Sequence, residues 1–376
     1  MLKSCIRFAM LLGVFAVSAG FVASLLGVSQ QGGSDNPVLK QRPPESKAGG
    51  PRAVEAAGQI LLDVVADDAS GKPVTGLEPW DFKVLDNGHP AKILTFRAFD
   101  GIEVKPDPPV EVILVIDTAN LPFQQVAFVR DQLDAFLRAN GGKLKQPTVL
   151  VLLSDSGIRI QPRATLDGNA EAEVVRQIKG SVHTINAAMG GEGALERFQL
   201  CVRQLEAIAD NESKAPGRKL LIWVGPGWPM LTREELESFS AKDQLRYFDA
   251  IVALSTSLRE ARMPVYSVAP QDSSVGAGVR DTAYMEYLKG VKSPKEADSA
   301  NLALKVLAVQ SGGEVLGPDN DVAGQIARCV ADANAFYRIS FNPPQAESAG
   351  AYHELRVTVD KPGVTVRTNS GYYTHP

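Results

Sequence analysis

Cysteine and histidine are both scarce in this sequence, and their scarcity excludes several classes of protein. The 376 residues include 3 cysteines and 4 histidines. Three cysteines are too few for a disulfide-rich scaffold or a cysteine-rich zinc protein. The histidines do not form an H-E-x-x-H pattern, and we expect solvated or strand-surface positions for His89, His353 and His375. The four histidines are His89, His183, His353 and His375.

An excess of positive charge is also missing. Lys and Arg number 39 against 43 Asp and Glu, which gives a net charge of −4 at pH 7. A nucleic-acid-binding protein normally carries a basic excess or a basic stripe, so we expect no nucleic-acid partner. The sequence also contains neither a G-x-S-x-G nor a G-x-x-x-x-G-K-[ST] motif, the signatures of common hydrolase and nucleotide sites. A hydrophobic fraction of 44% is nevertheless sufficient for a folded core.

The N-terminus has the pattern of an export signal. Lys3 and Arg7 precede an uncharged apolar run of 21 residues over 8–28. The run fits a cleaved signal peptide, and it is also as long as the about 20 residues that span a bilayer. Residues 1–28 are therefore predicted to be a signal peptide or an N-terminal membrane anchor. Either alternative exports the rest of the chain, into the periplasm or the medium. Residues 29–57, rich in Gly, Pro and Ser, are predicted to be a flexible linker.

Residues 58–105 are predicted to form strands without a helix. The segment ILLDVVAD reads as a strand, and Asn87-Gly88 separates two further β-rich runs. Asn-Gly between such runs indicates a tight hairpin, because both central residues of its turn need positive φ. A few strands of this kind do not close a sandwich by themselves.

Strands and helices then alternate over 106–335. The segments VEVILVID, KLLIWVGP and MPVYSVAP are almost wholly apolar, which is typical of parallel strands buried on both faces. Amphipathic helical patterns lie between them, for example VAFVRDQLDAFLRAN, and a capping-box pattern at 232–235 precedes a long helix ending near Arg262. This alternation predicts a doubly wound α/β fold with a mostly parallel sheet.

The C-terminal segment 336–376 is again β-rich, with the runs AFYRISF, YHELRVTVD and GVTVRT. We expect it to complete one small β-sandwich together with residues 58–105, so that the α/β domain is inserted between the two halves of the sandwich. The alternative is two separate small sheets, one from each segment.

The order of these elements resembles that of the von Willebrand factor A-type domain. The flanking segments, LLDVVADDASGKPVTGLEPWDFKVLDNGHPAKILTF and YRISFNPP followed by HELRVTVDKPGVTVRTNSGYY, resemble those of the bacterial VWFA-related family. The resemblance covers about 58–374 and implies a binding or adhesion role rather than catalysis.

In that family a metal site follows the first strand of the sheet as D-x-S-x-S, with a Thr from a second loop and an Asp after the fourth strand. Here Asp117 matches, but Ala119 and Leu121 replace both serines, and Pro226 stands where the second Asp is expected. The second loop is expected at 189–193, around Gly191, and lacks a Thr. Asp117 and Asn120 would then be the remnants of a vestigial metal site. No cofactor is expected, Mg²⁺ included, because hard cations need several oxygen ligands.

Other residues at this edge could contact a ligand. Asp117, Gly191, Pro226 and Trp228 are predicted to lie on the edge of the sheet where this kind of fold binds ligands. For Trp228 the alternative is packing in the core or at its rim. Cys201 and Cys329 fall in two predicted helices, and either pair in an oxidising compartment or stay as separate buried thiols.

The sequence therefore favours an exported, non-enzymatic protein-binding or adhesion-type module with a degenerate metal-ion-dependent adhesion site. Its partner would be a protein of unknown identity, with a possible membrane tether through residues 8–28. Two alternatives remain open at this stage: a structural scaffold of a cell-envelope assembly, and an exported enzyme without a recognisable motif.

Overall fold

The computed structural model describes residues 58–178, 190–231, 240–271, 283–344 and 350–374. The predicted signal or anchor and the predicted linker lie outside these residues. Among the helices of the described residues, none combines the length and the apolar character needed to cross a membrane.

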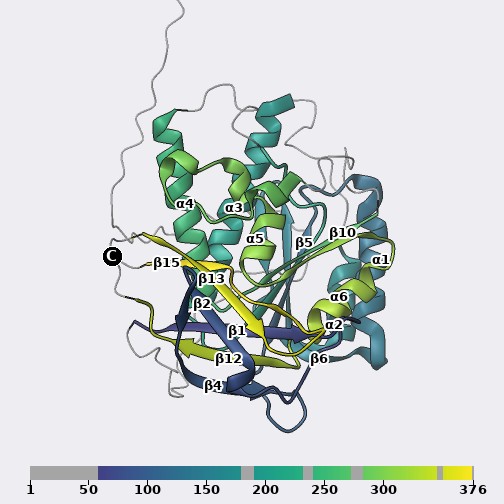
Figure 1. The fold of residues 1–376 in the computed structure, drawn as a ribbon. Helices are drawn as coiled ribbons and strands as arrows, with labels where there is room; N and C mark the ends of the chain where they lie inside the picture. Colours follow the sequence, from purple (N-terminus) through teal and green to yellow (C-terminus); the bar gives the residue numbers. More distant parts are fainter. Residues whose placement is uncertain (1–57, 179–189, 232–239, 272–282, 345–349, 375–376) are drawn as a thin grey trace, which may run out of the picture. The chain divides into compact units, whose positions relative to one another are not determined.

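A mostly parallel sheet of seven strands forms the α/β part of the chain (Figure 1). The strand order is β11-β10-β9-β5-β6-β7, with β8 also paired to β6. The pairs from β11 to β6 are parallel, whereas β7 and β8 run antiparallel to β6. The strands are β5 (Glu111–Asp117), β6 (Lys143–Ser154), β7 (Gly157–Ile160), β8 (Thr165–Asp167), β9 (Lys219–Val224), β10 (Val265–Pro270) and β11 (Glu314–Asp319).

Helices cover both faces of this sheet, which explains why its central strands are apolar throughout. Side chains from α1, α2 and α6 share one hydrophobic cluster with Leu220 and Ile222 of β9. Side chains from α3, α4 and α5 share another with Leu221 and Trp223, which point to the opposite face. The helices are α1 (Phe123–Gly142), α2 (Gly168–Arg176), α3 (Gly190–Ser213), α4 (Ala241–Glu260), α5 (Leu304–Gln310) and α6 (Val322–Ala331). Short 3-10 helices are η1 (Pro79–Asp81), η5 (Ala283–Tyr287), η6 (Pro294–Glu296) and η7 (Ser299–Leu302).

The N-terminal and C-terminal β segments pair with each other in two antiparallel sheets. Their strand orders are β14-β1-β12-β4 and β15-β13-β2-β3. In the first sheet Leu62 is opposite Ile339, and in the second Val84 is opposite Val357. The strands are β1 (Ile60–Asp67), β2 (Phe82–Asp86), β3 (His89–Ala91), β4 (Ile93–Phe99), β12 (Phe336–Phe341), β13 (Tyr352–Val359), β14 (Thr365–Arg367) and β15 (Gly371–Tyr373). Each sheet contains strands of both segments, so the alternative of one sheet per segment is wrong.

One hydrophobic cluster joins these two antiparallel sheets. The rings of Phe82 and Tyr337 lie 5.0 Å apart between them. The Tyr337 hydroxyl donates to the carbonyl of Val74 at 2.7 Å and accepts from the amide of Leu77 at 3.1 Å. A buried tyrosine is stable only with such partners. The N-terminal and C-terminal segments therefore depend on each other for their core.

The Asn87-Gly88 hairpin is present where the sequence predicts it. Asn87 has φ of 47° and Gly88 of 80°, between β2 and β3. Both residues adopt the left-handed region that a type I′ turn requires.

Two predicted local features need correction or lie beyond the described residues. The expected loop over 189–193 is wrong from Gly190 onward, because α3 begins there. The predicted capping box at 232–235 lies outside the described residues. The helix that follows, α4, is capped instead by Ser240, whose hydroxyl accepts from the amide of Asp243. It ends at Glu260, and Arg262 has a positive φ of 52°.

Candidate functional site

Asp117 is the last residue of β5, at the carboxyl end of the parallel sheet. The neighbouring strand β9 ends beside it, with Ile116 opposite Val224. Ligands of open α/β sheets bind in the crevice beyond these carboxyl ends. The position that the sequence singles out is therefore at the edge of the sheet suited to a binding site.

The Asp117 carboxylate is fully buried and accepts hydrogen bonds from uncharged groups. The indole Nε1–H of Trp223 donates to Oδ2 at 2.9 Å. The backbone amide of Asn120 donates to Oδ1 at 3.0 Å, and its side-chain Nδ2 donates to both oxygens at 3.0 and 2.9 Å. The same Nδ2 lies 3.2 Å from the sulfur of Cys201. The hydrogen bonds from Asn120 hold the loop after β5 against the carboxylate of Asp117.

Burial raises the pKa of Asp117 to about 6, even though the bonds from Trp223 and Asn120 lower it. Removal from water penalises the charged form of an acid, and neutral donors offset only part of that penalty. Burial, followed by the charge of Asp117, also raises the pKa of the Cys201 thiol well above its usual value.

The residues between Asp117 and α1 face the protein interior. The Thr118 hydroxyl donates to the carbonyl of Leu153 at 2.6 Å. Ala119 and Leu121 are buried in the hydrophobic clusters on the two faces of the sheet. These two positions, where the resembled family has serines, therefore contribute packing and no oxygen atom.

The turn after β9 packs directly against Asp117. A Cβ on Gly225 would lie 2.8 Å from the Cβ of Asp117, closer than side-chain atoms approach in proteins. Only glycine fits this close approach. Pro226 is half-buried beside it and supplies no side-chain oxygen at the position where the resembled family has an aspartate.

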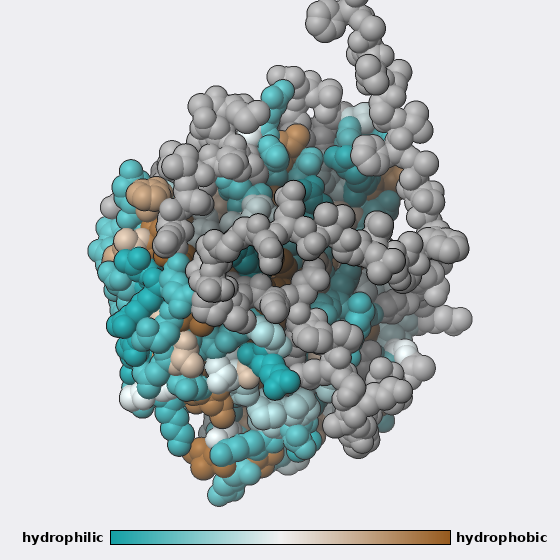
Figure 2. All heavy atoms as spheres, turned by 180° about the vertical axis from the view of Figure 1, so that it is seen from behind, coloured by the Kyte–Doolittle hydropathy of each residue, from teal (hydrophilic) through white to brown (hydrophobic). Residues whose placement is uncertain are grey.

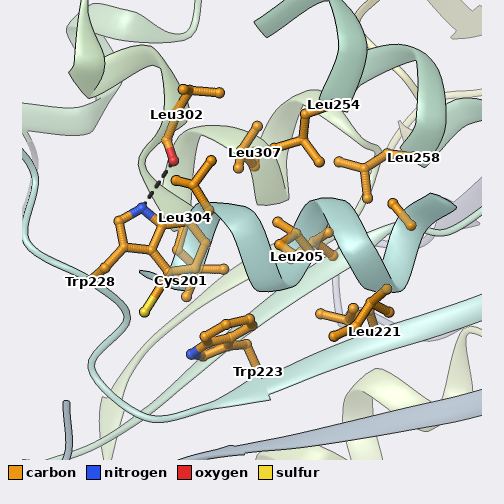
Figure 3. Close-up of a cluster of buried hydrophobic side chains, with 14 of the residues drawn as sticks. Cys201, Leu205, Leu221, Trp223, Trp228, Leu254, Leu258, Leu302, Leu304 and Leu307 are labelled. Carbon is orange, nitrogen blue, oxygen red and sulfur yellow. Dashed lines mark hydrogen bonds between the residues drawn. The ribbon is translucent and has the colours of Figure 1, made fainter. Parts of the chain in front are cut away.

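Trp228 packs in the core, which is the alternative that the sequence offered to a contact at the ligand-binding edge. It is only 5% exposed, and its indole Nε1–H donates to the carbonyl of Leu302 at 3.0 Å (Figure 3). Its ring packs edge-on against Trp223 with centroids 5.0 Å apart. Trp228 therefore belongs to the same hydrophobic cluster as Trp223 and Leu302.

Gly191 lies in the first turn of α3. From α3, the side chain that contacts the loop after Asp117 is Cys201, whose sulfur lies 3.2 Å from Nδ2 of Asn120. Of the four residues predicted for the ligand-binding edge, Asp117 ends β5 and Pro226 closely follows the end of β9. Gly225, which precedes Pro226, packs against Asp117.

Exposed hydrophobic side chains are scattered over the described surface. On the face in Figure 2 the coloured side chains are mainly hydrophilic, with hydrophobic ones in small separate groups. Phe123 is nonetheless 57% exposed, and as the first residue of α1 it directly follows the Asp117 loop. Sequence reasoning missed it because an aromatic residue at a helix start usually packs inward. The other large exposed hydrophobic residues are Trp80, Leu94, Ile102, Val104, Leu166, Leu245 and Met285.

The two cysteines Cys201 and Cys329 and the histidine His353 are also buried in the protein. Cys201 and Cys329 are free thiols buried on opposite faces of the sheet, so they are not paired. His353, expected on a strand surface, is buried. Its Nδ1 lies 2.7 Å from Oδ1 of Asp86, and the Tyr372 hydroxyl donates to the other oxygen at 2.7 Å. These three residues tie β2, β13 and β15 together.

No protein-family model matches the chain, and no curated protein matches it. Solved structures with limited similarity include BatB from Bacteroides thetaiotaomicron, described as a conserved hypothetical protein, at 13% identity and a TM-score of 0.29. That match covers 60% of this chain and 98% of BatB.

Two pilus proteins are similar to the same degree. The pilus adhesin SpaC from Lactobacillus rhamnosus GG matches at 10% identity and a TM-score of 0.30, over 80% of this chain and 48% of SpaC. The pilus tip protein Mfa5 from Porphyromonas gingivalis matches at 12% identity and a TM-score of 0.27, over 85% of this chain and 67% of the Mfa5 structure. TM-scores this low do not define a shared fold, so we base the proposal below on strand order and site residues.

Proposed function

We propose that this protein is an exported, non-enzymatic protein-binding module of the von Willebrand factor A type, which binds its partner without a bridging cation. The observation that carries the proposal is the Asp117 carboxylate at the carboxyl end of β5. Trp223 and Asn120 occupy both of its oxygens from inside the protein.

The strand order supports the fold type. β5, the first parallel strand in the chain, lies in the middle of the sheet, and the chain builds outward from it in both directions before ending at β11. The antiparallel β7 forms the opposite edge. A doubly wound, mostly parallel sheet is what the resemblance to the A-type domain implies, and Asp117 ends the first parallel strand as that resemblance requires.

The donor set around Asp117 does not fit a hard divalent cation. Mg²⁺ takes oxygen ligands in near-octahedral geometry and loses its hydration water reluctantly. Here the neighbouring positions are Ala119, Leu121 and Pro226, and the Thr118 hydroxyl is turned to Leu153. Both oxygens of Asp117 also already accept hydrogen bonds, from Trp223 and from Asn120.

Phe123 gives the edge a contact suited to a protein partner. Aromatic residues, Phe included, are enriched in protein interfaces relative to the rest of the surface. Pro226 lies half-buried beyond the end of β9 at the same edge. A partner could thus be recognised by shape and apolar contact.

A binding experiment tests this proposal. Partners would be captured on the purified protein from an envelope extract, then one identified partner would be titrated in excess Mg²⁺ and in EDTA. We expect equal affinity in both buffers and a loss of tenfold or more in Phe123→Ser. The matched control is Leu166→Ser, a similarly exposed residue of β8. This strand pairs with the amino-terminal half of β6, whereas Asp117 lies at the carboxyl end of the parallel strands. Affinity that vanishes in EDTA, or that falls only in the control, would refute the proposal.

A further inference from the structure

Asp63 of β1 is surrounded by more positive charge than it can neutralise. Arg262 forms a two-pronged bond to it, with N–O distances of 2.7 to 2.9 Å. Arg338 of β12 donates to Oδ1 at 3.3 Å, and Nε of Arg218 lies 3.8 Å from Oδ2. One carboxylate thus faces three guanidinium groups where β1 and β12 meet the loops before β9 and β10.

The positive charge is held away from water. The side chain of Arg218 is 1% exposed, that of Arg262 15% and that of Arg338 17%. Burial, together with the like charge of Arg262, lowers the pKa of Arg338 despite its bond to Asp63. A buried charge without a counter-charge is strongly unfavourable.

A small cavity opens beside these groups. Its volume is about 10 Å³, and the residues that line it include Asp63, Arg218, Arg259, Arg262 and Gly312. A space of this size holds one particle of about the size of a water molecule. Nε of Arg218 is buried and has no hydrogen-bond acceptor among the described residues.

The other contacts of Arg218 do not use that N–H. Its Nη1 donates to the carbonyl of Asp332, and its guanidinium lies over the ring of Phe336 at 4.4 Å. These contacts hold the guanidinium group of Arg218 in place without using Nε. A buried N–H without an acceptor is unfavourable, and the surplus of positive charge around Asp63 favours an anionic acceptor over a neutral one.

We propose that this cavity binds one small monovalent anion of the halide class, with Arg218 and Arg262 as its ligands. The anion would offset the excess charge around Asp63 and strengthen the contact between the antiparallel sheet and the α/β part of the chain. Phosphate and sulfate are too large for the space. A neutral water molecule would satisfy the N–H but would leave the charge uncompensated.

Thermal unfolding at constant ionic strength tests this proposal, with chloride replacing gluconate, an anion too large to enter. We expect the melting temperature to rise with chloride by about 2 to 4 °C for each tenfold increase above the dissociation constant. The control Arg246→Gln removes an exposed arginine of α4, whose side chain is 64% exposed, and should keep this response. Arg218→Gln should lose it.

Arg218→Gln also breaks the bond to Asp332, so a second measurement is needed in case this variant does not fold. A crystal of the unaltered protein soaked in bromide should show an anomalous peak within hydrogen-bonding distance of Nε of Arg218. Equal melting temperatures in chloride and gluconate, or a peak-free cavity holding only water, would overturn the proposal.

Discussion

Two buried aspartates, Asp63 and Asp117, differ in what surrounds them, and the difference shifts their pKa values in opposite directions. The side chain of Asp63 is 7% exposed and Asp117 is 0% exposed, so burial alone would raise the pKa of both. The guanidinium groups of Arg262, Arg218 and Arg338 overcome this effect and hold the pKa of Asp63 below its usual value. Asp117 has only neutral donors, and its pKa rises to about 6.

Asp63 joins β1 to Arg262, a residue far away in sequence, through an ion pair between two charged groups. Asp117, which we propose to be the remnant of a binding site, instead accepts hydrogen bonds from the neutral side chains of Trp223 and Asn120. Both side chains are buried, so the type of partner decides the direction of the pKa shift.

Removing the charge of Asp63 should produce the largest effect. Asp63→Asn leaves Arg218, Arg262 and Arg338 without their carboxylate, and breaking a buried ion pair in this way lowers the free energy of unfolding by about 3 to 5 kcal/mol. Urea denaturation measures this loss. The control is Asp360→Asn, which removes an exposed pair with Lys83 and should change stability by less than about 1 kcal/mol. Similar small losses in both variants would show that the three arginines do not depend on Asp63.

The two aspartates should also respond to pH with opposite signs. Asp117 binds its proton more tightly in the folded state, with a pKa near 6 against a usual value of 3.8. Its contribution is therefore greatest below about pH 4 and is lost as pH rises through 6, by about 3 kcal/mol at 1.36 kcal/mol per unit. Asp63, with a lowered pKa, contributes above the unfolded pKa and loses that contribution as pH falls.

Urea unfolding of the unaltered protein and of Asp117→Asn between pH 4 and pH 7 measures the first of these effects. The stability of the unaltered protein relative to the variant should fall as pH rises. The same comparison with Asp63→Asn should show no such fall. A pH-independent difference for Asp117→Asn would mean that Asp117 is ionised throughout this range.

A smaller effect is expected from the indole that faces Asp117. Trp223→Phe removes the N–H donated to Oδ2 and should lower stability by about 1 to 3 kcal/mol. Because that bond lowers the pKa of Asp117, the pKa should rise further in this variant, as followed by carboxyl ¹³C chemical shifts. Trp228→Phe is the matched control, since it loses an equivalent bond to Leu302 and should leave the Asp117 titration unchanged.

The smallest effect should come from the thiol beside Asn120. Cys201→Ala removes a contact of 3.2 Å but leaves the bonds from Asn120 to both Asp117 oxygens, so stability should fall by about 1 kcal/mol with no change in the Asp117 titration. Cys329→Ala, on the opposite face of the sheet, should behave alike. A shifted titration in Cys201→Ala alone would show that the thiol helps to orient Asn120.

Much of the fold follows from local patterns that the sequence displays openly. The apolar runs of β5, β9 and β10 predict buried parallel strands, and Asn87-Gly88 predicts its hairpin. The shared antiparallel sheets follow from a simple count, because neither terminal segment has enough strands alone. Asp117 is likewise predictable as a carboxylate at a strand end.

The features that could not be predicted depend on contacts between distant residues. The partner of Trp228 is a carbonyl contributed by Leu302, and the carboxylate of Asp63 meets arginines from three other segments. Neither contact leaves a periodic pattern. The helical start at Gly190 was missed because glycine is a poor helix former and reads as a loop.

The most direct test of the cation-independent edge is a metal titration of the purified protein, followed by melting temperature in Mg²⁺, Mn²⁺, Ca²⁺ and EDTA. A cation bound at 100 times its dissociation constant would stabilise the protein by about 2.7 kcal/mol, a shift of several degrees. With Asp117 already bonded to Trp223 and Asn120, we predict equal melting temperatures in EDTA and at millimolar metal, in both the unaltered protein and Asp117→Asn. A saturable rise with metal that disappears in Asp117→Asn would contradict the account, because it would show that Asp117 coordinates a cation.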